Sequence, residues 1–297
     1  MTLFISDLDF TLLDSDGTFS RRSAERLNSL ISEGMKFTVA TARASPSIKH
    51  MMAEVNLNLP IIELNGAILR DLQSGHILEH RGLGAHNAAL INDCFVELGI
   101  APYVSALIDD HNPLFYPELN NAGMQWFLDE KTARSDPRLT PWPKDLFTSI
   151  NVSGSRGKNS AFDDILSFTY LGPKTEIDTI AKLVRQAAPE VLITTYPNHY
   201  IGDWEIVIAA ADANKGNAIN RLLEYLSTDL KVKVSKTTAF GDSSNDLEML
   251  NTVDHPVAVS NASAEIKASA REIIGHHKDG AVIDYLEKAH RSQATNA

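Results

Sequence analysis

The sequence lacks the features that mark several specialised classes of protein. Its 297 residues include one cysteine, Cys94, so no internal disulfide can form, and the neighbouring residues favour a packed thiol on a helix. No apolar run approaches the roughly 20 residues that a membrane-spanning helix needs. The first residues also lack the basic start and unbroken apolar stretch of a secretion signal. We therefore expect a cytoplasmic protein with no membrane partner.

Positive charge is also scarce. The chain has 27 Lys and Arg against 38 Asp and Glu, which gives a formal net charge of −11 at pH 7. Such a balance disfavours binding to the phosphate backbone of nucleic acids, so we expect no nucleic-acid partner. The rest of the composition, with 43% hydrophobic and 22% charged residues, is that of a globular protein that can bury a core.

The two ends of the chain alternate short apolar runs with helical patterns. This alternation predicts right-handed crossovers and a parallel sheet covered on both faces, which is a Rossmann-like, doubly wound α/β fold. The expected strands are residues 3–6, 37–40, 61–62, 238–240 and 257–259, and the expected helices include 22–33, 218–226, 247–250 and one that begins at Ser45-Pro46.

The middle of the chain is less regular. Turn signals at Asn65-Gly66 and Ser74-Gly75 indicate a hairpin. Beyond it, helical and strand patterns mix, with helices expected at 88–98 and 175–188 and strands at 165–171 and 191–196. We therefore expect a discontinuous core of residues 1–81 and 210–297, an inserted α+β domain of residues 82–209, and a disordered tail over 291–297.

Two carboxylates, Asp7 and Asp9, follow the first expected strand, and Thr11 lies two residues further on. In open α/β sheets ligands bind outside the carboxyl ends of the strands, so this placement puts both acids where a ligand is expected. Taken alone, the pair fits a turn built by aspartates equally well.

A second acidic cluster, Gly241-Asp242-Ser243-Ser244-Asn245-Asp246, also follows an apolar strand and begins a helix. Its oxygen atoms could bind a hard cation, or could form only an Asx turn with a helix cap. Two acid-rich strand ends in one sheet favour the cation, because clustered carboxylates repel each other unless an ion such as Mg²⁺ offsets the charge.

Together these segments resemble the haloacid dehalogenase superfamily, and within it the Cof-like subfamily IIB of sugar-phosphate phosphatases. Asn65-Gly66-Ala67 and the chain length agree with that branch. The resemblance implies a parallel-sheet core with an inserted cap domain that closes to exclude water. Four segments match the superfamily's motifs in order: residues 7–13 (DLDFTLL), 40–43 (ATAR), 214–216 (NKG) and 241–246 (GDSSND).

The resemblance assigns the chemical steps to two residues. Asp7 would attack phosphorus and form an aspartyl phosphate. Asp9 would protonate the leaving oxygen and then deprotonate the attacking water. A Mg²⁺ ion would be held by the Asp7 carboxylate, the Asp9 carbonyl and Asp242.

The resemblance also implies a phosphate-binding set. Thr41 and the backbone amides of Leu8, Asp9 and Ala42 would donate hydrogen bonds to phosphate oxygens, and Lys215 would add a point charge. Asn245 would contact phosphate, and Asp246 would orient the cation's water or Lys215. The role of Arg43 stays open between substrate contact and helix capping.

Two positions depart from the superfamily's usual pattern. Phe10 stands where glycine is usual, and could pack under the sheet or narrow the entrance to the site. Ala42 also replaces a frequent glycine, which is tolerable unless that position needs a positive φ.

The sequence therefore predicts a Mg²⁺-dependent phosphomonoesterase that acts on small soluble phosphate esters, with sugar phosphates favoured. A phosphomutase on the same scaffold, or a phosphatase for nucleotides or cofactors such as FMN and PLP, is an alternative. A different class, a phospho-acceptor regulator without turnover, would also keep the aspartate cluster.

Overall fold

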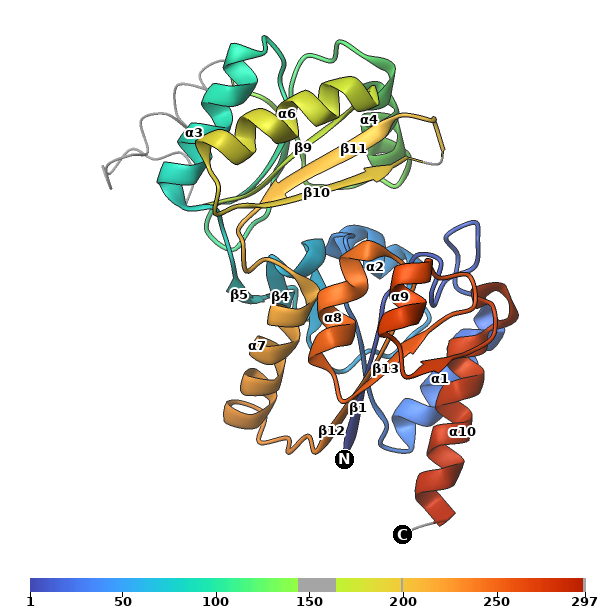
Figure 1. Cartoon of the computed structure of the whole chain (residues 1–297). Helices are drawn as coiled ribbons and strands as arrows, with labels where there is room; N and C mark the ends of the chain where they lie inside the picture. Colours follow the sequence, from blue (N-terminus) through green and yellow to red (C-terminus); the bar gives the residue numbers. More distant parts are fainter. Residues whose placement is uncertain (144–163, 199, 296–297) are drawn as a thin grey trace. The chain divides into compact units, whose positions relative to one another are not determined.

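The computed structural model describes residues 1–143, 164–198 and 200–295 (Figure 1). The chain divides into two compact units, each with its own hydrophobic core. The core unit consists of Met1–His80 and Asn214–Ala297, and the inserted unit of Arg81–Ala213. The insertion thus interrupts the core unit between its N-terminal and C-terminal segments.

The core unit is built on a five-stranded sheet in which every neighbouring pair is parallel. Leu3 and Ile5 of β1 (Thr2–Ser6), an interior strand of this sheet, are fully buried, as expected where helices cover a parallel sheet. The predicted α/β class is therefore confirmed. In sheet order the strands are β14 (Glu272–Ile273), β13 (His255–Ala258), β12 (Lys236–Gly241), β1 (Thr2–Ser6) and β2 (Lys36–Val39).

Helices and short 3-10 turns connect these strands (Figure 1). Gly216 lets α7 approach α8, because a Cβ there would meet the carbonyl oxygen of Glu248 at 2.5 Å. The elements are α1 (Arg21–Ser32), α2 (Ser45–Met51), η1 (Leu64–Gly66), α7 (Lys215–Thr228), η2 (Ser244–Asp246), α8 (Leu247–Thr252), α9 (Ala264–Ser269), η3 (His277–Asp279) and α10 (Ala281–Thr295).

The expected disordered tail is wrong for residues 291–295, because α10 continues to Thr295. Arg291 pairs with Glu287 one turn earlier, and the Ser292 hydroxyl donates to the carbonyl of Lys288. Such contacts between residues four apart support a polar helix end. Residues 296–297 lie outside the described part of the chain.

The third expected strand forms, but it pairs mainly outside the parallel sheet, to which a single bridge connects it. β3 (Ile61–Glu63) pairs antiparallel with β4 (Ile68–Arg70), and β4 pairs with β5 (Ile77–His80), which confirms the expected hairpin. Neighbouring strands joined by a short turn pair antiparallel, and this local pairing prevails here. One isolated parallel bridge joins Ala40 to Ile62, directly after β2.

In its described residues the inserted unit combines helices with a six-stranded mixed sheet, as predicted for an α+β insertion. The Phe95 ring of α3 (Gly84–Glu97) stacks on Phe168 at 5.9 Å. Tyr103, on the opposite sheet face, donates a hydrogen bond to Met124 of α4 (Ala122–Ala133). The remaining elements are α6 (Lys174–Ala187) and, in sheet order, β10 (Leu192–Pro197), β11 (Trp204–Ala209), β9 (Asp164–Gly172), β6 (Tyr103–Leu107), β7 (Leu114–Tyr116) and β8 (Leu139–Pro141).

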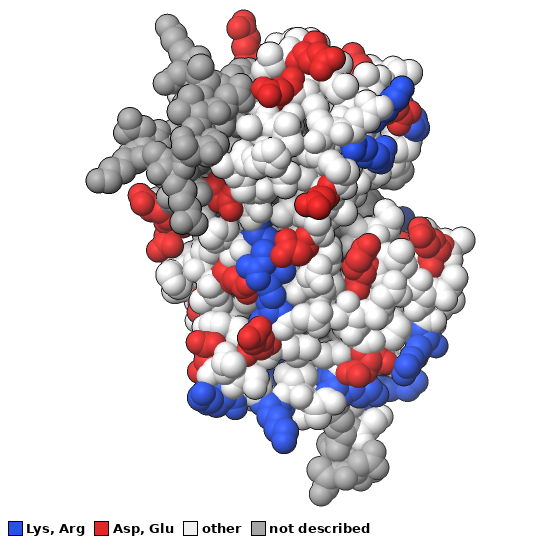
Figure 2. Space-filling view, turned by 60° about the vertical axis from the view of Figure 1, so that its left-hand side comes forward, with Lys and Arg blue, Asp and Glu red and all other residues white. Residues whose placement is uncertain are grey.

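The surface agrees with the charge balance of the sequence. On the face drawn in Figure 2, the described acidic and basic side chains are interspersed, and no broad basic surface is visible there. Among the helices of the described residues, none has the length and apolar character that a membrane crossing requires.

Candidate active site

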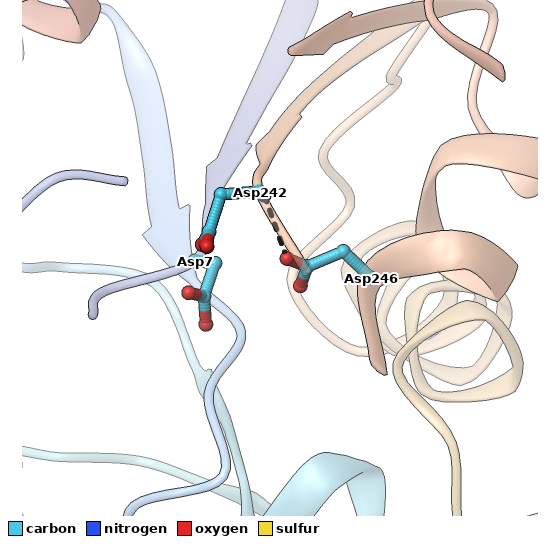
Figure 3. Close-up of side chains that lie close together, drawn as sticks. All are labelled: Asp7, Asp242 and Asp246. Atoms are coloured by element: carbon cyan, nitrogen blue, oxygen red, sulfur yellow. Dashed lines mark hydrogen bonds between the residues drawn. The ribbon is translucent and has the colours of Figure 1, made fainter. Parts of the chain in front are cut away.

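The two acidic clusters meet at the carboxyl ends of β1 and β12. These strands are parallel neighbours, and the Asp7 amide extends the ladder by donating to the carbonyl of Phe240 at 3.0 Å. Asp7, Asp242 and Asp246 consequently offer carboxylate oxygens that lie within 4.8 Å of one another (Figure 3). Sheet order thus gathers side chains that lie more than 230 positions apart in the sequence.

Asp246 reaches the cluster through a tight turn at the end of β12. One of its oxygens accepts hydrogen bonds from the backbone amides of Asp242 and Ser243, at 2.9 and 3.1 Å. Ser243 completes a reciprocal capping box at the start of η2. A Cβ at Gly241 would meet Asp246 Cβ at 2.7 Å, so glycine is the residue that permits this turn.

Lys215 lies at the start of α7 with no exposed surface. Its Nζ is 2.6 Å from Oδ1 of Asp7 and 2.7 Å from Oδ1 of Asp246. Burial lowers the pKa of this ammonium, but the two carboxylates outweigh burial and raise the pKa above its ordinary value. Lys215 therefore stays a fixed positive charge between Asp7 and Asp246.

The positive charge of Lys215 does not balance the negative charge of the carboxylates around it. Burial raises the pKa of Asp7 well above its ordinary value, and repulsion from Asp246, Asp242 and Asp9 adds to the rise that Lys215 opposes. Burial and Asp246 likewise raise the pKa of Asp242 to about 7, although a hydrogen bond from the Thr11 hydroxyl, at 2.8 Å, acts against the rise.

The donor set of this cluster fits a divalent cation. Carboxylate oxygens are hard ligands of the kind that Mg²⁺ prefers, and a cation would supply the positive charge that the buried aspartates lack. The raised pKa values of Asp7 and Asp242 are the physical sign of that deficit.

Asp9 does not join the buried cluster. Both of its carboxylate oxygens accept hydrogen bonds from the Arg43 guanidinium, Oδ2 from Nε at 2.7 Å and Oδ1 from the Nη2 amino group at 2.6 Å. The sequence left Arg43 open between substrate contact and helix capping, and neither alternative identified this partner. No local signal could have done so, because the two residues are 34 positions apart.

Thr41, Ala42 and Arg43 form a short segment that follows β2. Thr41 is fully buried, its amide donates to the carbonyl of Ile62, and its hydroxyl accepts from the amide of Arg43 at 3.1 Å. Ala42 does not adopt a positive φ, so alanine in place of glycine imposes no backbone strain here. The buried Glu63 accepts a hydrogen bond from the amide of Ser45, the first residue of α2.

Asn245 lies in the same turn as Asp246. Its Nδ2 donates to Asn65 at 3.0 Å, and its Oδ1 accepts from the Ser243 hydroxyl at 2.6 Å. Asn65 therefore belongs to this neighbourhood, although the sequence marked it only as part of a turn and of a segment that agrees with the subfamily, without a role in the site. Leu8 is buried, and its carbonyl accepts from the amides of Leu12 and Leu13, which folds the chain after Asp7 into a compact turn.

Known proteins resemble this chain over nearly its whole length. A family model of haloacid dehalogenase-like hydrolases matches residues 4–286. The Bacillus subtilis 5-amino-6-(5-phospho-D-ribitylamino)uracil phosphatase YwtE is 24% identical, covering 95% of this chain and 96% of the relative. The HMP-PP phosphatase of Serratia proteamaculans is 25% identical, with 96% and 94% covered.

Solved structures share the fold. A haloacid dehalogenase-like hydrolase from Bacteroides thetaiotaomicron matches with a TM-score of 0.75 at 17% identity, covering 97% of this chain and 99% of the other. The subclass IIB sugar phosphatase BT4131 matches with a TM-score of 0.69 at 15% identity, with 97% and 98% covered. The family and fold predicted from the four motifs are thereby confirmed.

Proposed function

This chain belongs to the haloacid dehalogenase-like hydrolases and is a phosphatase, and we propose that it hydrolyses small phosphate monoesters through an aspartyl phosphate on Asp7. One observation carries the proposal. The cluster of the buried Asp7 and Asp246 with the half-buried Asp242 holds a single lysine and an excess of negative charge, at the end of the sheet where α/β proteins bind their ligands.

Asp7 is proposed as the nucleophile. In the first step a carboxylate oxygen of Asp7 bonds to phosphorus while the bond from phosphorus to the ester oxygen breaks. In the second step a water oxygen bonds to phosphorus and the Asp7 carboxylate leaves. The contact of Lys215 with Oδ1 fixes the orientation of the carboxylate, which supports this assignment.

Asp9 is proposed as the general acid and base. It would give a proton to the ester oxygen as that oxygen leaves, and take a proton from the attacking water in the second step. Since Arg43 occupies both Asp9 oxygens, Asp9 must exchange at least one of these contacts to reach the leaving group. Arg43 would then return the carboxylate to one position between the steps.

A phosphate-binding role is proposed for residues of the four matched motifs that carry hydrogen-bond donors. Lys215 supplies an ammonium, Thr41 a hydroxyl and Asn245 a side-chain amide, while Leu8 and Ala42 contribute backbone amides. Such donors stabilise the charge that develops on the three equatorial phosphate oxygens.

Asp7, Asp242 and the Asp9 carbonyl are the proposed ligands of Mg²⁺. Asp246 is less suited as a ligand, because Lys215 and two backbone amides already occupy its oxygens, and its proposed role is to orient Lys215. When bound, Mg²⁺ screens the negative nucleophile from the negative phosphate and stabilises charge in the transition state.

Sugar phosphates are the proposed substrate class. A second candidate is a phosphate ester with a heterocyclic leaving group, which the activity of the relative YwtE, a phosphatase for a ribitylaminouracil phosphate, favours. A screen of purified protein with Mg²⁺ against both classes would rank them by kcat/KM. Inorganic phosphate should appear with at least one class, and chelation with EDTA should stop its release.

The same screen tests the alternatives. Absence of phosphate release from every ester, with Mg²⁺ present, would overturn the proposal. Phosphorus NMR would identify a phosphomutase by a phosphoryl group that returns to the sugar instead of to water. A stable acyl phosphate with no free phosphate would identify a phospho-acceptor regulator.

A further inference from the structure

The turn that carries Asp9 has an unusual backbone. Phe10, the next residue, adopts a φ of +56° with 37% of its surface exposed. Residues other than glycine rarely adopt this left-handed backbone conformation. A phenylalanine side chain also has no polar group that could stabilise it by a local hydrogen bond. The conformation of Phe10 must therefore be held by its neighbours.

Those neighbours are Asn261, which follows β13, and His277 of η3. Asn261 Nδ2 donates to the carbonyl of Phe10 at 2.8 Å, and Asn261 Oδ1 accepts from the amide of His277 at 3.1 Å. Nδ1 of the buried His277 lies 2.9 Å from the carbonyl of Leu13, so this nitrogen carries the proton and donates. The His277 ring also packs edge-on against Phe10 at 5.8 Å.

These contacts grip the turn on both sides of Thr11. The Thr11 hydroxyl donates a hydrogen bond to Asp242, and the Leu8 carbonyl accepts hydrogen bonds from the backbone amides of residues 11–13. Because the residues after Phe10 are fixed in this way, a change of φ at Phe10 would displace the chain before it. The residue displaced would be Asp9.

We infer that Asn261 and His277 are positioning residues, which hold Phe10 in its left-handed conformation and thereby set the Asp9 carboxyl for proton transfer. The inference rests on the proposed function of Asp9. Glycine at position 10 would adopt this conformation unaided, whereas phenylalanine makes the geometry of Asp9 depend on a segment about 250 residues away.

Substrates with different leaving groups distinguish a change in the position of Asp9 from a general disturbance of the active site. Alkyl phosphates need a proton on the departing oxygen, whereas p-nitrophenolate leaves without one. In the full chain with Mg²⁺, Asn261→Ala should lower kcat/KM at least about tenfold for a sugar phosphate but less than about threefold for p-nitrophenyl phosphate. The ratio kcat/KM covers the steps up to departure of the leaving group, so slow dephosphorylation does not mask the difference.

Asn28 provides a matched control. It also joins two backbone positions, donating to the carbonyl of Glu54 and accepting from the amide of Asn56, in a part of the core unit outside the proposed machinery. Asn28→Ala should change kcat/KM for both substrates by the same factor. Equal losses on both substrates in Asn261→Ala, or no loss on either, would overturn the inference while leaving the phosphatase assignment intact.

A second variant tests the role of Phe10 directly. In a Phe10→Gly background, Asn261→Ala should cause a much smaller selective loss of kcat/KM for the sugar phosphate. Glycine keeps the left-handed turn without the hydrogen bond from Asn261. Additive effects would contradict the inference. If Asn261→Ala does not fold, Asn261→Asp keeps the acceptor for His277 and removes the donor to Phe10, so the same selective loss is expected. An inactive wild-type protein would instead defeat the proposed function itself.

Discussion

The core unit and the inserted unit both bury charged side chains, but in different ways. In the inserted unit Arg138 and Asp136 are two residues apart and bind each other with a shortest contact of 2.7 Å, and Asn112 accepts a further hydrogen bond from Arg138. In the core unit Lys215 binds Asp7 and Asp246, which come from distant parts of the chain.

The pKa values show what this difference means. Burial alone would raise the pKa of Asp136, but the hydrogen bonds and charge of Arg138 outweigh it and lower the pKa. Burial instead prevails at Asp7 and Asp242, where the pKa is raised. The inserted unit has a saturated pair that stabilises a fold, whereas the core unit has unbalanced carboxylates, which are typical of functional sites.

The largest expected effect comes from removing the nucleophile. Asp7→Asn should reduce phosphate release at least about a thousandfold, because a side-chain amide cannot form the acyl phosphate. The matched change Asp136→Asn should leave turnover within about threefold when it is assayed well below its melting temperature. Activity retained in Asp7→Asn would contradict the assignment, provided that the protein is free of wild-type contamination.

Replacing the positively charged side chain of each ion-pair group, Lys215 in the core unit and Arg138 in the inserted unit, should separate effects on activity from effects on stability. Lys215→Met and Arg138→Met each leave buried carboxylates unpaired, which should lower the free energy of unfolding by about 3–5 kcal/mol. Urea unfolding measures this loss. Per folded molecule, only Lys215→Met should lose hydrolysis of p-nitrophenyl phosphate. A comparable loss in Arg138→Met would show that the two groups are not as different as their contacts indicate.

The raised pKa of Asp242 predicts a pH-dependent response to Mg²⁺. In the metal-free protein this carboxyl favours folding below its unfolded pKa of 3.8, and that contribution is lost as the pH rises through about 7. Mg²⁺ should therefore raise the melting temperature more at pH 8 than at pH 5. Asp242→Asn should reduce this difference, and an unchanged difference would argue against Asp242 as a ligand.

The smallest effect is expected at Glu205 in the inserted unit. Its pKa is raised by burial, and it accepts a hydrogen bond from the Tyr196 hydroxyl at 2.8 Å. Its contribution to folding is present below pH 4.5 and declines as the pH rises. Glu205→Gln should thus be neutral at low pH and stabilise by about 1 kcal/mol at pH 8. Destabilisation at pH 8 in urea would show that the ionised form has a partner.

Much of the fold was accessible from sequence because its signals are local. Alternating strand and helix patterns predicted the parallel sheet, and turn residues predicted the hairpin after Asn65. The strand at Ile61–Glu63 joins the parallel sheet only through one bridge and pairs mainly with β4, because its own residues do not specify its partner. The end of α10 was missed because a short polar helix end resembles a disordered tail in composition.

The candidate site divides in the same way. The placement of Asp7, Asp9 and Asp242 after predicted strands marked them as candidates, and the resemblance of four motifs to the superfamily gave them their expected roles. The partner of Asp9 was not accessible, and neither was the grip of Asn261 on Phe10, because each joins chain segments that only folding brings together.

The sequence by itself determined which side chains stand at the ends of which strands, and the resemblance of its motifs to a known superfamily indicated phosphoryl chemistry. Tertiary structure decided which of them form ion pairs and hydrogen bonds. Lys215 is a buried cation between two aspartates, Arg43 binds Asp9, and Asp246 accepts hydrogen bonds from backbone amides. Spacing along the chain sets local conformation, whereas ion pairing depends on distances of a few ångströms, which the order of strands in the sheet creates.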